Sequence, residues 1–211
     1  ILNAEMPIEG YGGEKGYPAL GSTRYLGMMP IRRAIEKSLN VVAARTLFDV
    51  VTPQVGAEYL VKLGVNPSRI NVDGPGLALG TTGITPIEMA AAYAAIENDG
   101  VYREPDCIVR IEDSRGNVLS AGEEKSRQVY EEDAARMMTD VLTTVVESGT
   151  ARNCSLNNMP AACKTGTTTS NVDGWLCGYT PYYTTAVWVG KDLYEAQEGL
   201  KGNTYPAYIW K

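Results

Sequence analysis

The chain has 211 residues, 44% of them hydrophobic and 21% charged, which is enough for one globular domain with a complete core. Its net charge of −6, without a long basic block, argues against a nucleic-acid partner. No apolar run of about 18 residues occurs, so the sequence predicts no membrane-spanning helix within these residues.

Histidine and cysteine usage narrows the chemistry further. Histidine is absent, which excludes Ser-His-Asp and Cys-His catalysis and most zinc and haem sites. Acid–base catalysis at neutral pH would therefore need a Lys, Asp, Glu or Tyr with a shifted pKa. The four cysteines form no C-x-x-C pair, and we expect buried free thiols, with a Cys163–Cys177 disulfide across two neighbouring strands as the alternative. No metal or organic cofactor is expected.

The first half of the chain predicts a loop followed by helices. Residues 1–28 are rich in Gly, Pro and Tyr without a period and predict a loop. Apolar residues at helical spacing predict a helix over residues 30–47, with Pro30 suited to its first turn. A second helix is predicted between Thr52 and Gly64.

The middle of the chain carries clear start and stop signals. Residues 71–84 are glycine-rich and predict a loop. The sequence T-P-I-E at residues 85–88 then predicts a capping box that opens a helix ending at Gly100. Residues 107–119 predict a hairpin with a glycine-containing turn.

One helix and a run of strands complete the chain. A helix is predicted over residues 131–147, followed by strands at 161–167, 175–179 and 184–189 and a last helix that starts near Tyr205. The buried face predicted for the first of these helices comprises Ala134, Met137, Met138, Val141, Leu142 and Val145. Helices followed by consecutive strands indicate an α+β fold, with helices packed on an antiparallel sheet.

The stretch Lys164-Thr165-Gly166-Thr167-Thr168 combines a cation, a glycine and three hydroxyls. On an extended strand, Lys164, Gly166 and Thr168 share one face, whereas Thr165 and Thr167 share the other. Because Gly166 has no side chain, a ligand's backbone can approach closely. At an exposed sheet edge this stretch could hold an extended, anionic peptide. The alternative is a polar strand end beside a turn.

A second polar group, Ser38-Leu39-Asn40, lies inside the first predicted helix. Ser and Asn favour caps and turns, because their side chains form local hydrogen bonds with the backbone. At a spacing of two, Ser38 and Asn40 can point the same way only if the helix breaks there. The alternative is two polar side chains on the solvent face of an unbroken helix.

These two groups match the second and third motifs of a known set, S-x-x-K, S-x-N and K-T-G, found in serine β-lactamases and penicillin-binding proteins. They occur here in the expected order, and the sequence between them is also similar. The chain thus resembles, from about residue 20 onward, the transpeptidase domain of class A (bifunctional) penicillin-binding proteins. The resemblance is carried further by residues 77–80, 84–94, 98–102, 137–150, 173–181 and 187–190.

The resemblance implies a D,D-transpeptidase that cross-links peptidoglycan stem peptides ending in D-Ala-D-Ala through a serine acyl-enzyme, the same serine that β-lactams acylate. Ser38 would relay a proton to the departing nitrogen, and Asn40 would bind the substrate amide. Lys164 would hold this relay and supply positive potential.

The strand would bind the substrate's end. The resemblance assigns the terminal carboxylate to the Thr165 and Thr167 hydroxyls, with Gly166 and Thr168 in the same substrate-binding strand. The Thr167 N–H would be one oxyanion donor. Because strict alternation places Lys164 on the opposite face from both threonines, these shared roles require a twisted or edge strand.

The first motif is missing, because no serine in the chain is followed by Lys three residues later. The resemblance therefore implies that the nucleophile and its base lie upstream of Ile1. Residues 1–211 are then expected to be the C-terminal portion of a single transpeptidase domain, soluble and inactive alone. The parent protein is expected to be membrane-anchored upstream and to act at the extracytoplasmic face of the bacterial cell membrane.

Two other functions share these motifs. One is a β-lactamase or β-lactam-sensor domain, although Leu39 replaces the Asp of the lactamase S-D-N motif. The other is a catalytically inactive module that binds D-Ala-D-Ala without a nucleophile. An S-x-x-K upstream of Ile1 would indicate the enzyme.

Overall fold

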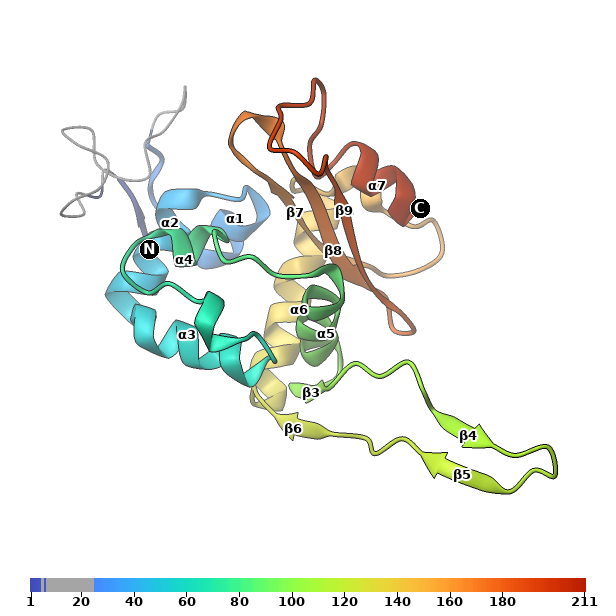
Figure 1. Cartoon of the computed structure of the whole chain (residues 1–211). Helices are drawn as coiled ribbons and strands as arrows, with labels where there is room; N and C mark the ends of the chain where they lie inside the picture. Colours follow the sequence, from blue (N-terminus) through green and yellow to red (C-terminus); the bar gives the residue numbers. More distant parts are fainter. Residues whose placement is uncertain (5, 7–24) are drawn as a thin grey trace.

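The computed structural model describes residues 1–4, 6 and 25–211, and it places a three-stranded sheet against helices on both sides (Figure 1). Helices α5 and α6 pack against the sheet and against each other, and α7 packs on strands β8 and β9. The helices are α1 (Ile31–Glu36), α2 (Asn40–Arg45), the π-helix η2 (Thr46–Val51), α3 (Pro53–Lys62), α4 (Gly76–Leu79), α5 (Pro86–Glu97), α6 (Glu132–Glu147) and α7 (Tyr205–Trp210), with short 3-10 turns η3 (Pro67–Arg69), η4 (Arg152–Cys154) and η5 (Thr169–Asn171). The predicted α+β class is confirmed.

The strands form one three-stranded and three two-stranded antiparallel units among the described residues. They are β1 (Leu2–Asn3), β2 (Gly27–Met28), β3 (Val101–Arg103), β4 (Arg110–Glu112), β5 (Val118–Ala121), β6 (Ser126–Gln128), β7 (Ala162–Thr167), β8 (Gly174–Tyr179) and β9 (Thr184–Val189). The pairs are β1–β2, β3–β6 and β4–β5, and the larger sheet has the order β7-β8-β9. Strand β7 is therefore an edge strand in the described part of the chain.

The main core lies around β7 and β8. Leu176, Cys163 and Val145 are completely buried in it, and they come from β8, β7 and α6. In the register of the sheet, Lys164 lies opposite Cys177 and Thr165 opposite Leu176. Cys163 and Cys177 therefore project from opposite faces, because adjacent residues alternate. All four cysteines are free, so the alternative of a Cys163–Cys177 disulfide is wrong.

The capping box predicted for α5 is confirmed. The Thr85 hydroxyl accepts a hydrogen bond from the Glu88 N–H at 3.3 Å, and the Glu88 carboxylate accepts one from the Thr85 N–H at 2.8 Å. Arg69 pairs with the same carboxylate, and this contact lowers the pKa of Glu88 to about 2. The box fixes the start of the helix that packs on β8 and β9.

The buried face predicted for the helix at 131–147 is partly wrong. Ala134, Met137 and Met138 are exposed. The inward stripe instead carries Thr139, whose hydroxyl is hydrogen-bonded to the Tyr179 hydroxyl at 2.8 Å. A search for apolar residues at helical spacing does not find a buried stripe that includes threonines. The buried residues of α6 are Ala135, Leu142, Val145 and Val146.

Two other local predictions need correction, and one strand pair was not predicted. The loop predicted for residues 1–28 pairs at its described ends, as β1 with β2, while residues 5 and 7–24 lie outside the described part. The glycine-rich loop at 71–84 contains the short helix α4. The pair β3–β6 had no predicted counterpart, because three-residue strands carry almost no pattern.

Residues 103–128, which we call the arm, extend away from the body (Figure 1). The arm begins at the strand pair β3–β6 and carries the predicted hairpin β4–β5 at its far end. Every residue of the arm is exposed except Asp113, which is half-buried. Within the described residues, no helix has the length and apolarity that crossing a membrane requires.

Candidate active site

The predicted first helix breaks at the S-x-N group. Ser38 adopts a left-handed backbone conformation with φ 55°, and Asn40 is the first residue of α2. The Ser38 N–H donates to the Ile35 carbonyl at 3.0 Å, which closes α1 before the turn. Left-handed backbone in a non-glycine residue is strained and occurs often at functional sites. The helix therefore breaks between Ser38 and Asn40, as it must if their side chains are to point the same way.

One hydrogen bond joins the two motifs across 126 residues of sequence. The Lys164 ammonium donates to the Ser38 Oγ at 2.8 Å and to the Thr165 carbonyl at 2.8 Å. Because Ser38 accepts this bond, its own O–H stays available to a substrate atom. Ser38 and Asn40 are both exposed, so the group is open to a ligand.

Burial shifts the pKa of the lysine in this hydrogen-bonded pair. It lowers the pKa of Lys164 to about 8, because an ammonium is costly to remove from water. The side chain shares its sheet face with Cys177, whose thiol pKa burial raises to about 12. A lysine with a pKa near neutrality can both carry positive charge and exchange a proton.

The two threonines of β7 are held from behind by residues that the motifs do not include. The Thr165 and Thr150 hydroxyls are hydrogen-bonded at 2.7 Å. The Thr167 hydroxyl accepts the Gly202 N–H at 3.0 Å, which leaves its own O–H free to donate. Gly202 must be glycine here, since a Cβ would lie 2.6 Å from the Gly166 carbonyl oxygen.

Thr168 lies just beyond β7 and belongs to a turn. Its hydroxyl accepts from the Asp173 N–H at 2.7 Å and donates to the Asp173 carboxylate at 3.1 Å. The Trp188 indole N–H donates to the other oxygen of the same carboxylate at 2.9 Å. This network anchors the end of the strand, and Thr168 therefore has less hydrogen-bonding capacity for a ligand than Thr165 or Thr167.

Sequence reasoning did not single out Thr150, Asp173 or Gly202 as parts of the site. Thr150 also donates its N–H to the Glu36 carbonyl at 3.2 Å, next to the Ser38 turn. The contacts of Thr150 with Glu36 and of Gly202 with Thr167 join segments far apart in the sequence, and no local pattern encodes such a pairing. The sequence signal for Thr150 is the glycine before it, in a segment after α6 that resembles the family.

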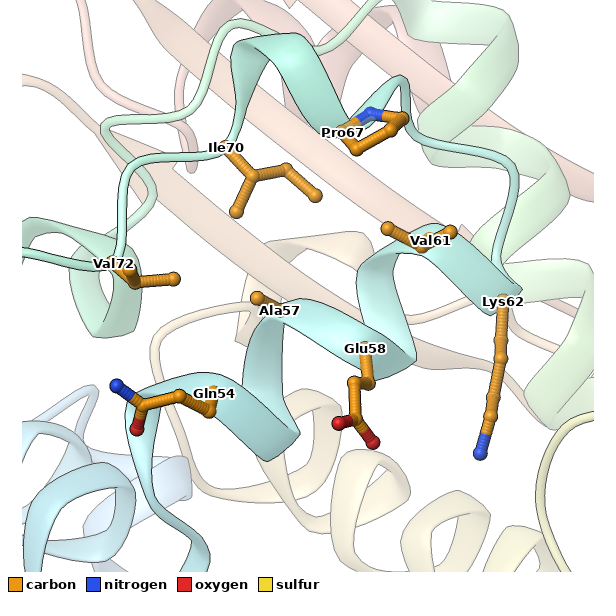
Figure 2. Close-up of a pocket in the computed structure, with 8 residues that line it drawn as sticks. All are labelled: Gln54, Ala57, Glu58, Val61, Lys62, Pro67, Ile70 and Val72. Atoms are coloured by element: carbon orange, nitrogen blue, oxygen red, sulfur yellow. The ribbon is translucent and has the colours of Figure 1, made fainter.

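A groove of about 600 Å³ beside α3 is separate from these residues (Figure 2). Pro67, Ile70 and Val72 face Ala57 and Val61 across it, and none of the predicted site residues lines it. Gln54, Glu58 and Lys62 extend from α3 at its margin. The groove is apolar and lacks the convergent polar groups of a catalytic site.

Comparison with known proteins agrees with this arrangement. The family model described as penicillin binding protein transpeptidase domain matches residues 8–208. Penicillin-binding protein 1A of Clostridium botulinum is 33% identical over 190 residues, which cover 88% of this chain and 23% of that protein. The chain therefore spans about a quarter of the length of this curated relative.

Solved structures share the fold. Penicillin-binding protein 1A from Haemophilus influenzae matches with a TM-score of 0.86 at 24% identity, over 100% of this chain and 38% of that one. PonA1 from Mycobacterium tuberculosis, solved in complex with penicillin V, matches with a TM-score of 0.76 at 27% identity, over 88% of this chain and 55% of that one.

Proposed function

The chain belongs to the penicillin binding protein transpeptidase domain family, and we propose from this premise that it forms the proton-relay and carboxylate-binding part of a D,D-transpeptidase site. The substrates are peptidoglycan stem peptides ending in D-Ala-D-Ala. The observation that carries the proposal is the 2.8 Å hydrogen bond from Lys164 to Ser38, which brings the two family motifs into one site.

Ser38, Lys164 and Asn40 carry the chemistry of this proposal. Ser38 passes a proton to the nitrogen that departs when the terminal D-Ala is released. Lys164, with its pKa lowered to about 8, holds Ser38 in place and takes part in the proton exchange. Positioned proton transfer of this kind contributes roughly 10²–10⁴-fold to a rate. The exposed amide of Asn40 binds the substrate's peptide group.

The edge strand binds the end of the stem peptide. The Thr165 and Thr167 hydroxyls take the terminal carboxylate, and the contacts from Thr150 and Gly202 fix both hydroxyls from the protein side. Gly166 is part of the strand along which the peptide lies, and Thr168 lies in the turn at the end of this strand. The Thr167 N–H serves as one oxyanion donor, and losing such a donor typically costs about 10²–10³-fold in turnover.

β-Lactams compete for the same site in this proposal. PonA1, a structural relative of this chain, was solved in complex with penicillin V. We extend that binding to this chain's Lys164, Ser38 and edge strand. The site would work in the cell wall, at the extracytoplasmic face of the membrane, within a membrane-anchored parent protein.

The nucleophile is proposed to come from outside these 211 residues, because no S-x-x-K occurs among them. Residues 1–211 would then be the C-terminal portion of one transpeptidase domain. The test has two arms, read by fluorescent penicillin and denaturing electrophoresis. The chain alone should form no covalent band, and a band would place the nucleophile within it.

The second arm tests the activity itself. A form of the protein that includes an S-x-x-K segment upstream of Ile1 should label with fluorescent penicillin. The variant Ser38→Ala should label more slowly by about 10²-fold or more if Ser38 relays the proton. An unlabelled S-x-x-K form, or an unaffected Ser38→Ala variant, would contradict the proposed function.

A further inference from the structure

The outer edge of β4 is an open, regular strand edge at the far end of the arm. Strand β4 pairs only with β5, so its other side has no strand partner among the described residues. Leu119 has no partner in the register of β4 with β5. The extra residue of this bulge therefore lies in β5, and β4 is unbroken. The Gly122 N–H donates to the Val109 carbonyl, so Val109 faces β5. Because backbone direction alternates along a strand, the N–H and C=O groups of Arg110 and Glu112 point away from β5.

A hairpin of this kind needs more support than it has within the described chain. Two-stranded hairpins are marginally stable in water, and three or more strands are needed for independent stability. Val109 is 87% exposed and Ile111 is 46% exposed, which is unusual for side chains on one face of a strand pair. Strand β4 is only three residues long, but the backbone N–H and C=O groups on its unpaired edge can still pair with those of another chain.

The charges on β4 indicate what that other chain is. Arg110 and Glu112 flank Ile111, and at present they pair with each other at 2.8 Å while both remain partly exposed. In an antiparallel pair of two β4 strands centred on Ile111, Arg110 of each copy lies opposite Glu112 of the other. Two ion pairs then form on one face, and the two Ile111 side chains meet on the other face.

The backbone geometry fits the same register. Arg110 and Glu112 are the outward-facing residues, and opposite each other they form hydrogen-bonded pairs, while Ile111 takes the closer, non-hydrogen-bonded position. A shift of two residues would instead oppose Arg110 to Arg110 or Glu112 to Glu112. The charges therefore favour the register centred on Ile111 in a pair of identical strands, and they disfavour the registers shifted by two residues.

We propose that two copies of this chain associate through their β4 edges, forming a continuous four-stranded sheet β5-β4-β4-β5 across a two-fold axis. A two-fold interface uses the same patch on both subunits, and the sequence Arg110-Ile111-Glu112 is complementary to itself in this sense. The association lies on the arm, away from Ser38 and Lys164, and does not depend on the proposed function.

Sedimentation equilibrium of the 211-residue chain over a range of concentrations tests this proposal. The chain should pass from monomer to dimer as its concentration rises. Arg110→Glu should weaken the dimer by about tenfold or more, because both ion pairs become like-charge pairs. The matched control is Arg103→Glu, which breaks the exposed ion pair between Arg103 of β3 and Glu124 and should leave the dimer unchanged.

The double variant Arg110→Glu/Glu112→Arg provides the decisive comparison, because it restores opposite charges in the same register. Its dissociation constant should return to near that of the unsubstituted chain. A chain that stays monomeric at every concentration overturns the proposal. So does a dimer that Arg110→Glu leaves unchanged, or one that the double variant fails to restore.

Discussion

The three-stranded sheet and the arm are both made of antiparallel strands, yet only the sheet has a core. Leu176 of β8 is completely buried between helices, whereas Leu119 of β5 is 67% exposed. Strand β7 carries Lys164 and the threonines on this packed support, which holds their side chains in fixed positions. The arm has no such support in the described chain, so its strands depend on each other or on a partner. Rigid packing suits a site, and an open edge suits an interface.

The largest expected difference between the two regions comes from the same substitution in each. Leu176→Ala should lower the free energy of unfolding by about 2–5 kcal/mol, because it removes buried methyl groups and leaves a cavity. Leu119→Ala should change it by no more than about 0.5 kcal/mol, since its side chain is mostly in water. Urea unfolding at low protein concentration, followed by circular dichroism, measures both. Equal costs would show that the arm is packed in solution.

This contrast was only partly visible in the sequence. The hairpin, the sheet strands and the capping box at Thr85 follow local patterns, and all were predicted and confirmed. The arm's exposure was not predicted, because an alternation of apolar and polar residues looks the same whether or not another layer covers the strand. The buried stripe of α6 was misplaced for a related reason, since Thr139 lies on it.

The candidate site shows the same limit. The spacing of Ser38 and Asn40 showed that a shared direction required a helix break, and the break is present. The alternation along β7 placed Lys164 apart from Thr165, and the two side chains indeed bond different segments, Ser38 and Thr150. Thr150 itself could not be found from the sequence, because its contact depends on how α6 and β7 pack.

A second prediction sharpens the comparison through pH. The pKa of Lys164 is about 8 in the folded chain, against about 10.4 for an unfolded lysine. Below pH 8 both states carry the proton, so the cost of burying the ammonium is fully present. Between these values the unfolded state binds more protons, so this group's contribution to stability rises with pH.

Comparison with Lys164→Met isolates that contribution from other groups. Burial raises the pKa of Cys177 and of Tyr179 to about 12, and these groups make stability fall as pH rises. From pH 7.5 to pH 10.5, the unsubstituted chain should gain about 1–3 kcal/mol relative to Lys164→Met in urea unfolding. A stability difference between the two chains that stays constant over this pH range would mean that the Lys164 ammonium is solvated.

The smallest expected effect compares two local side-chain-to-backbone motifs. Thr85→Ala removes the cap of α5 and should lower the free energy of unfolding by about 1 kcal/mol, because α5 packs on the sheet. Asp113 plays a similar local role in the arm, where one carboxylate oxygen accepts the Arg115 N–H at 2.8 Å and the Asn117 N–H at 2.9 Å. Asp113→Ala should instead speed hydrogen exchange in β4 and β5 and leave the urea midpoint unchanged, since the arm opens without the core. A midpoint shift as large as that of Thr85→Ala would show that the arm and the sheet unfold as one unit.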